Sequence, residues 1–138
     1  MLPRLKVKLH QGWIPVANPN GPATYVRGSG PNPPALQFSI AQHKPGALPN
    51  VTPESLVGIC ERMTEKVRGR RSISKSSGEC TFGKYGTVIA KGDAPAHVQI
   101  WVLSNEREFI LVTHTCEIDP EPKEDEEANQ IALLTSCE

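Results

Sequence analysis

The last third of the chain constrains the fold most, because two apolar segments there lead into an acidic stretch and a final helix-forming sequence. Residues 97–104 and 108–116 are rich in Val, Ile, Leu and aromatic residues, which favour pleated strands. Apolar side chains fall on both alternating faces of these segments, and strands of that kind are buried on each side. The sequence therefore predicts a central antiparallel hairpin that is covered on both faces.

The earlier part of the chain predicts shorter strands. Apolar and basic residues alternate over 5–9, which is typical of a half-exposed strand. Prolines leave room only for short strands near 24–27 and 35–42, for which edge strands joined by ordered loops fit best. A disordered linker is the alternative, although the apolar residues of these segments favour an ordered structure. Glycines then separate β-prone segments near 72–81 and 85–91, which indicates an antiparallel meander.

Two helices are predicted between and after these strands. The first begins with Thr52 as its cap and Pro53 at its first position, and it ends near Gly69. The second follows Pro120, with four acids at 124–127 in its first turns, where negative charge suits the helix dipole. We expect these acids to lie in solvent, in a negative patch with three acids just before them: Glu117, Asp119 and Glu121.

Length and charge set further bounds. A chain of 138 residues fits one domain, 1–138, of α+β class: a single antiparallel sheet of about six to seven strands flanked by two main helices. Fifteen basic and fifteen acidic residues give a formal net charge of zero, so no global field attracts nucleic acid or an anionic membrane. The first residues contain no apolar run of signal-peptide or membrane-helix length, and we expect a cytoplasmic protein.

The layout of these elements resembles the PsbP-like superfamily, which also holds the yeast nuclear-transport factor that binds Ran. The resemblance rests on three segments: Gly12-Trp13 after the first strand, the helix capped by Thr52, and the segment 110–116 that leads into the last helix. The resemblance covers nearly the whole chain and suggests a bacterial-type member. It implies a binding module, since relatives dock to the water-oxidising photosystem, bind a small GTPase or serve as chaperone-like adaptors of secretion systems.

One group of side chains has the composition of a site. A two-residue turn at Asn105-Glu106 would place His97 opposite His114, with Cys116 on the same face. Two imidazoles and a thiol can ligate zinc or support nucleophilic chemistry. A three-residue turn would separate them, and the sequence places no carboxylate to orient either ring. Packing histidines are the alternative, and we expect no cofactor, no metal and no catalytic residue.

A basic cluster lies at the end of the first predicted helix and could bind a protein partner. The residues predicted to contact that partner are Arg68, Arg70 and Arg71. No aromatic residue lies among these cations, so stacking on nucleic acid bases is not expected. The basic cluster and the acidic patch could also bind each other between copies, which would give weak, salt-sensitive homo-oligomers.

The sequence contains no phosphate-binding glycine loop and no nucleophile elbow around a serine. The four cysteines lie too far apart in sequence for a zinc ribbon, and we expect free thiols. The predicted function is therefore a non-catalytic protein–protein interaction module, of adaptor or chaperone type, with an unidentified protein partner. The alternative is a small-ligand-binding protein or enzyme that uses the face of His97, Trp101 and His114.

Overall fold

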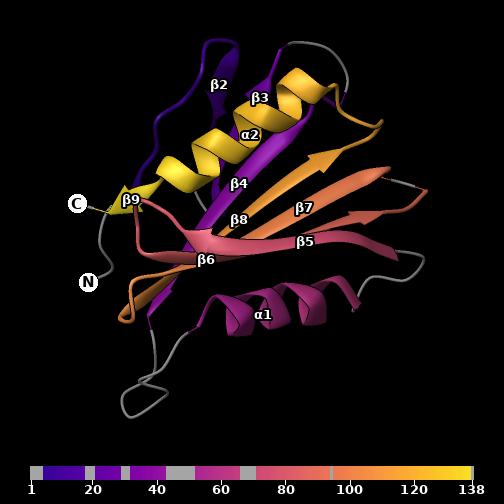
Figure 1. Cartoon of the computed structure of the whole chain (residues 1–138). Helices are drawn as coiled ribbons and strands as arrows, with labels where there is room; N and C mark the ends of the chain where they lie inside the picture. Colours follow the sequence, from indigo (N-terminus) through magenta and orange to yellow (C-terminus); the bar gives the residue numbers. More distant parts are fainter. Residues whose placement is uncertain are drawn as a thin grey trace.

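The computed structural model describes residues 5–17, 21–28, 32–42, 52–65, 71–93 and 95–137. Its elements, in chain order, are β1 Leu5–Lys6, β2 Trp13–Val16, β3 Ala23–Arg27, β4 Ala35–Gln42, α1 Pro53–Glu65, β5 Arg71–Glu79, β6 Lys84–Lys91, β7 His97–Ser104, β8 Glu108–Cys116, α2 Pro122–Leu134 and β9 Ser136–Cys137 (Figure 1). Seven strands form an antiparallel sheet in the order β2-β3-β4-β8-β7-β6-β5, and β1 pairs with β9. The predicted α+β class is confirmed.

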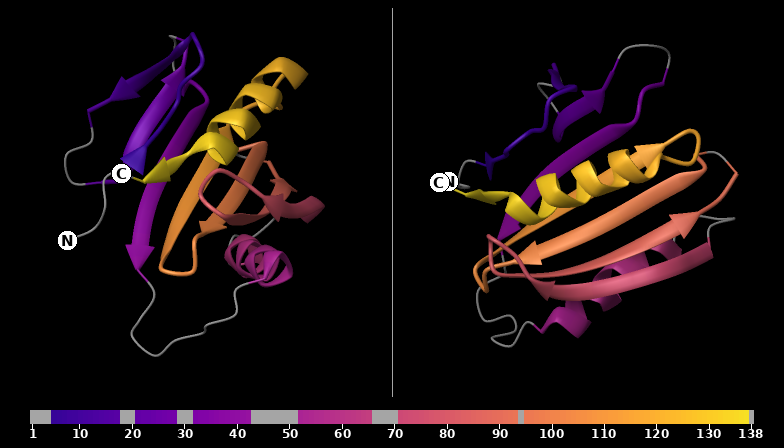
Figure 2. Two further views of the ribbon diagram at one scale, coloured as in Figure 1. Left: turned by 60° about the vertical axis from the view of Figure 1, so that its left-hand side comes forward. Right: turned by 45° about the horizontal axis from the view of Figure 1, so that its top comes forward.

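The two helices lie on opposite sides of the large sheet (Figure 1; Figure 2, right). On one side α1 packs against β5, β6 and β7. On the other side the apolar residues of α2 join the main core, whose largest fully buried members are Trp101, Phe38, Leu36, Leu103, Ile110 and Ile131. The hairpin β7–β8 is therefore covered on both faces, as its sequence predicted.

The start of α1 confirms the predicted cap. The Thr52 hydroxyl accepts a hydrogen bond from the amide of Ser55 at 3.1 Å, and the Ser55 hydroxyl accepts one from the amide of Thr52 at 3.1 Å. This reciprocal pair satisfies amides that the first turn of a helix leaves without partners. The described part of α1 ends at Glu65, and the predicted end at Gly69 lies outside the described residues.

A glycine allows α1 to approach the sheet closely. A Cβ atom on Gly86 of β6 would lie 2.3 Å from the backbone nitrogen of Val57 and 2.6 Å from the carbonyl carbon of Leu56. Only glycine leaves room for the helix backbone at this separation. The close contact lets Leu56 and Cys60 pack fully buried against Val88.

The first predicted strand is shorter than expected. Only Leu5 and Lys6 form β1, which pairs with Cys137 and Ser136 of β9, so both ends of the described chain meet in a small second sheet. The large sheet instead begins with β2, whose proline at position 15 marks it as an edge strand.

The sheet side that carries α1 is bare over its other half. There β2, β3 and β4 present Ile14, Val16, Val26, Gln37 and Ser39, a group that we call the open face. Ile14 is 52% exposed and Val16 is 43% exposed. Figure 2 (left) shows β2 and β3 far from α1, and no helix in the described ranges lies over the open face.

Candidate functional site

The hairpin brings the predicted histidine–cysteine group together in a different register. His97 pairs with Cys116, and His114 pairs with Gln99, so the register that a two-residue turn would give, with His97 opposite His114, does not form. The turn is longer than two residues, because the Asn105 side-chain oxygen accepts hydrogen bonds from the amides of Arg107 and Glu108 at 2.9 and 2.8 Å. The pairing shifts by two residues, which preserves the faces of both strands.

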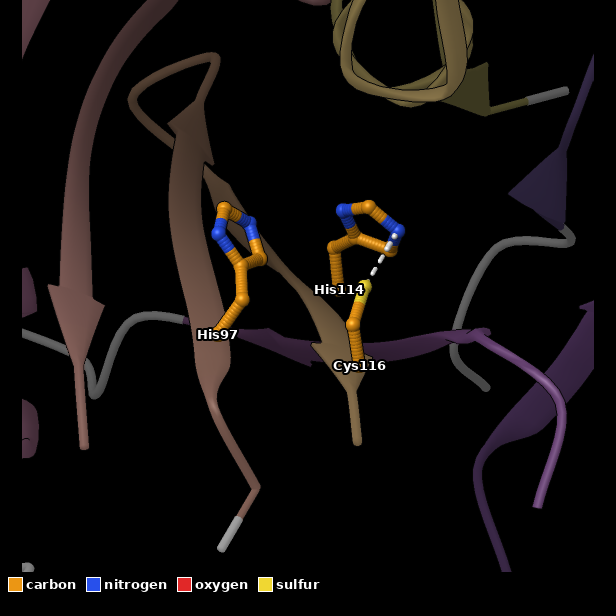
Figure 3. Close-up of side chains that lie close together, drawn as sticks. All are labelled: His97, His114 and Cys116. Carbon is orange, nitrogen blue, oxygen red and sulfur yellow. Dashed lines mark hydrogen bonds between the residues drawn. The ribbon is translucent and has the colours of Figure 1, made fainter. Parts of the chain in front are cut away.

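All three side chains point to the α2 side and are buried (Figure 3). The centres of the two imidazole rings are 5.3 Å apart. Cys116 Sγ lies 3.2 Å from His114 Nε2. One donor atom each from His97, His114 and Cys116 lies within 4.8 Å of the other two. The structure thus places the predicted residues in one cluster on β7 and β8.

A carboxylate from α2 completes this cluster, and the sequence analysis missed it. Glu124 Oε2 lies 2.9 Å from His114 Nε2 and accepts a hydrogen bond from Cys116 Sγ at 3.2 Å. Glu124 is only 6% exposed, so the expectation that the acids at 124–127 all lie in solvent is wrong. We use "the buried cluster" for His97, His114, Cys116 and Glu124.

Glu127, one turn further along α2, is the second buried acid. Its Oε1 accepts hydrogen bonds from Trp13 Nε1 at 2.9 Å and from Arg27 Nε at 3.1 Å. A helix-period signal could have identified both acids. The buried residues of α2 are Glu124, Glu127, Ala128, Ile131 and Ala132, spaced as one helical stripe.

The protonation of the buried cluster follows from its contacts. Burial raises the pKa of the Cys116 thiol, and the hydrogen bond and charge of Glu124 raise it further. Burial alone would raise the pKa of Glu124, but hydrogen bonds from His114 and Cys116 outweigh it and lower the pKa overall. The cluster therefore holds a neutral thiol that donates to an ionised carboxylate.

His97 sits at the outer end of the cluster, beside a cation. Its Nδ1 is 2.7 Å from Lys91 Nζ, which also donates to Asp119 at 2.7 Å. Burial lowers the pKa of His97 to about 4, and the charges of Lys91 and His114 act in the same direction. His97 is therefore neutral at physiological pH, and a neutral imidazole is the form that binds metal ions.

Three buried polar atoms near the cluster have no hydrogen-bond partner among the described residues: His97 Nε2, His114 Nδ1 and Asp125 Oδ1. The nearest contact of His97 Nε2 is Asp125 Oδ1 at 3.7 Å, which is too long for a hydrogen bond. Each unsatisfied buried group costs roughly 1–3 kcal/mol. In native structures such groups are paired with an ordered water or an ion, or they have a functional role.

The arrangement does not match a nucleophilic triad. In such a triad the acid holds one ring nitrogen of the histidine while the other nitrogen faces the nucleophile. Here Cys116 and Glu124 both contact Nε2 of His114, and within the described structure Nδ1 has no partner. The raised pKa of the thiol also opposes formation of a thiolate nucleophile.

A surface cavity of about 370 Å³ reaches two members of the cluster. Cys116 and Glu124 lie at its wall, and the loop before α2 supplies further acids, Glu117, Asp119 and Glu121. The buried cluster is therefore connected to solvent through an opening lined by these acids and by a cation, Arg27.

The other predicted site residues are not brought to this cluster. Trp101 is fully buried under α2, where its Nε1 donates to Asn129 at 3.1 Å. A cavity of about 340 Å³ beside α2 is lined by polar residues such as Gln99 and Asn129, and Trp101 does not line it. Arg71 is exposed at the start of the edge strand β5, whereas Arg68 and Arg70 lie outside the described residues.

Solved structures of other proteins share this fold, among them the following two. LpqN of Mycobacterium tuberculosis, described as involved in cell envelope biogenesis, matches with a TM-score of 0.72 and 13% identity over 98% of this chain and 83% of its own. Cyanobacterial PsbP (CyanoP) from Synechocystis sp. PCC 6803 matches with a TM-score of 0.64 and 13% identity, covering 100% of this chain and 95% of its own. Neither the family models nor the curated proteins compared with the sequence give a match.

At this level of identity the likeness shows the fold alone. The predicted resemblance to PsbP-type proteins is confirmed as a PsbP-like fold. The predicted link to the Ran-binding transport factor stays a prediction.

Proposed function

We propose that this chain is a protein-binding module that takes its partner on the open face of the sheet and catalyses no reaction on it. The observation that carries the proposal is the exposure of Ile14 and Val16, at 52% and 43%, on a sheet face that no described helix covers. Contiguous exposed aliphatic side chains on a folded protein mark interaction surfaces more often than scattered ones do.

The composition of the open face favours a protein partner. Its aliphatic side chains, Ile14, Val16 and Val26, lie beside the polar side chains of Gln37 and Ser39. An apolar centre with a polar border is typical of protein–protein interfaces. None of these five residues is charged, whereas a nucleic-acid surface requires cations for the phosphates.

The edges of the sheet are less suited to a partner than the open face. The edge strand β2 contains Pro15, which has no amide to donate to an added strand. The opposite edge strand, β5, has an irregularity between Ser72 and Ser74 and presents Lys75 to solvent. Prolines, bulges and lysines are the devices that stop edge strands from pairing with other chains.

The small-ligand alternative has less support. It requires a concave pocket on which His97, Trp101 and His114 converge, but α2 covers Trp101 completely. The basic cluster is a second partner surface in the prediction from sequence, and of its three arginines only Arg71 belongs to the described part of the chain.

Site-specific crosslinking tests the open face. A photoreactive amino acid at Gln37, which is exposed on β4, should trap a protein partner when the chain is expressed in its native cell. The same amino acid at Ser74, on the exposed edge strand β5, serves as the matched control and should trap none. Equal trapping at both positions, or no adduct at Gln37, would refute the proposal.

Two variants then locate the binding energy. Ile14→Asp combined with Val16→Asp should abolish capture of the trapped partner, because it places charge on the apolar centre of the interface. Ile73→Asp, which changes another exposed aliphatic residue (52% exposed, on β5), should leave capture intact. Loss of capture with Arg71→Glu, and not with the open-face variant, would assign binding to the basic cluster. A second copy of this chain as the trapped partner would make the interface homo-oligomeric.

The cellular location belongs to this proposal. In the described part of the chain, neither helix has the length and apolar character needed to cross a membrane. The cytoplasmic location expected from the sequence stays a prediction, and LpqN is described as involved in cell envelope biogenesis. Fractionation of the native cell into cytosol and envelope checks it, and the open face is a candidate surface in either compartment.

A further inference from the structure

We propose that the buried cluster is a binding site for a divalent transition-metal ion of the zinc class, held by Cys116, His114, His97 and Glu124. The proposal is independent of partner binding on the open face, which lies on the other side of the sheet.

The donor set matches zinc in type and number. Zinc prefers cysteine sulfur, imidazole nitrogen and carboxylate oxygen, and it takes four ligands in a tetrahedron. The buried cluster offers one sulfur, two imidazoles and one carboxylate. Magnesium and calcium require oxygen ligands and do not fit this set.

The distances are close to those of a loaded site. Sγ of Cys116, Nε2 of His114 and Oε2 of Glu124 form a triangle with sides of 3.2, 2.9 and 3.2 Å. With zinc–ligand bonds of about 2.0–2.3 Å, tetrahedral donors lie roughly 3.3–3.6 Å apart. Small outward rotations of these side chains would therefore admit the ion, and His97, with a donor atom within 4.8 Å, closes the fourth side.

Hydrogen bonds among the described residues do not satisfy every polar atom of the buried cluster. Within the described structure, His97 Nε2 and His114 Nδ1 are buried without a partner. His97 can therefore bind an ion through Nε2 without loss of an existing hydrogen bond. Nε2 of His114 would exchange its contacts with Glu124 and Cys116 for shared coordination of the ion, and the ring proton would then reside on Nδ1. Both rings are less than 2% exposed, so these nitrogens are not solvated at the surface of the protein.

The local charge favours a cation. Glu124 belongs to the cluster, and the carboxylates of Asp119 and Asp125 lie close enough to act on it. Among the described residues two cations lie nearby, and each is already paired with an acid: Lys91 with Asp119, and Arg27 with Glu127. The cavity of about 370 Å³, in whose described lining acids outnumber the single cation Arg27, supplies a route to Cys116 and Glu124 from solvent. On binding, the Cys116 proton passes to solvent and the ion takes its place on the sulfur.

The ion would join two strands to a helix. His97 belongs to β7, His114 and Cys116 to β8, and Glu124 to the first turn of α2. A ligand that binds only the folded state stabilises it by mass action. Metal binding should therefore fix α2 on the sheet and raise the melting temperature by several degrees.

Cobalt substitution tests the site directly. Metal-free protein, prepared with a chelator, is titrated with Co²⁺ alone, and we expect one equivalent to produce thiolate-to-cobalt absorption and tetrahedral cobalt bands. Zn²⁺ should then displace the cobalt, with a dissociation constant tighter than about 1 μM in calorimetry. Absence of thiolate-to-cobalt absorption in the wild-type chain overturns the proposal.

Matched variants assign the ligands. Cys116→Ser should remove the absorption and weaken zinc binding by at least about 100-fold, and Glu124→Gln by at least about 10-fold, since changes even to residues that only support a ligand cost about 10–100-fold. The control is Cys80→Ser combined with Cys137→Ser, which removes two half-buried thiols outside the cluster and should change neither. If the control removes the absorption, the metal binds elsewhere and the proposal is wrong. Circular dichroism verifies folding, and if Cys116→Ser does not fold, the result with Glu124→Gln decides.

Discussion

The two helices cover opposite faces of the same hairpin, yet they bury different chemistry. Under α1 the contact is apolar, with Leu56 and Cys60 packed on Val88 and its neighbours on β7. Under α2 the contact combines an apolar core with a row of polar groups, in which Glu124 reaches His114. The α1 interface therefore stabilises the fold and does no more, whereas the α2 interface also brings together atoms that can bind a metal ion.

Two cysteines show what this difference means. Cys60 and Cys116 are both buried, and burial raises the pKa of each thiol, that of Cys60 to about 12. The Cys60 thiol faces backbone carbonyl oxygens, those of Gly86 and Ile100 at 3.4 and 3.6 Å. The Cys116 thiol instead faces an imidazole and a carboxylate. Burial makes both thiols poor nucleophiles, and only the neighbours of Cys116 make it a metal ligand.

The largest expected effect lies at the α1 interface. Gly86→Ala should reduce the free energy of unfolding by about 3 kcal/mol, because the new Cβ would lie 2.3 Å from the Val57 nitrogen. The matched control is Gly58→Ala within α1, whose Cβ would meet only the Arg62 side chain at 3.6 Å and should stabilise the helix by up to about 1 kcal/mol. Urea denaturation measures both, and equal effects would contradict the close approach of α1 to β6.

The next effect concerns the polar contact under α2. Glu124→Ala should cost about 2 kcal/mol in metal-free protein, because His114 and Cys116 lose their buried acceptor. Glu126→Ala, at an exposed position of the same helix, should change stability by less than about 0.5 kcal/mol. If both variants unfold at the same urea concentration, Glu124 has no structural role in the α2 interface.

The same contrast explains what could be predicted from sequence. The cap at Thr52 and the apolar stripe of α1 are local patterns, and both predicted that helix correctly. The hairpin was also predicted, since apolar residues on both of its faces require cover on both sides. These features depend on neighbours in the chain, for which period and composition are sufficient guides.

The polar side of α2 could not be predicted in the same way. Glu127 accepts its hydrogen bond from Trp13, a residue 114 positions earlier, and no local pattern encodes that partner. An acid-rich helix start normally lies in solvent, and this expectation outweighed the helical spacing of Glu124 with Ala128 and Ile131. The sequence left the length of the hairpin turn open, and the register differs by two residues from that of a two-residue turn because the Asn105 side chain stabilises a longer one.

A smaller effect appears in the pH dependence of stability. Burial alone would raise the pKa of Glu127, but hydrogen bonds from Trp13 and Arg27 outweigh it and lower the pKa. A carboxyl group with a lower pKa in the folded state stabilises the protein above its unfolded pKa, near 4.5, and this stability is lost as the pH falls below that value. Glu127→Gln should therefore lose stability at neutral pH and show a shallower decline on acidification than Glu121→Gln, which changes an exposed acid. Parallel declines would mean that Glu127 is not paired in solution.

The smallest effect is a difference in reaction rate between the two buried thiols. In a chain that carries Cys80→Ser and Cys137→Ser, only Cys60 and Cys116 can react with a thiol reagent. Both should react slowly, since burial raises the pKa of each. Cys116 should react first, because it lines the cavity of about 370 Å³, whereas Cys60 lies under α1. Zinc should slow Cys116 alone. Only Cys116 has further metal-binding donor atoms beside it, so zinc should bind there and leave Cys60 unprotected. Equal rates for the two thiols, or protection of Cys60 by zinc, would therefore contradict the proposed difference between the α1 and α2 interfaces.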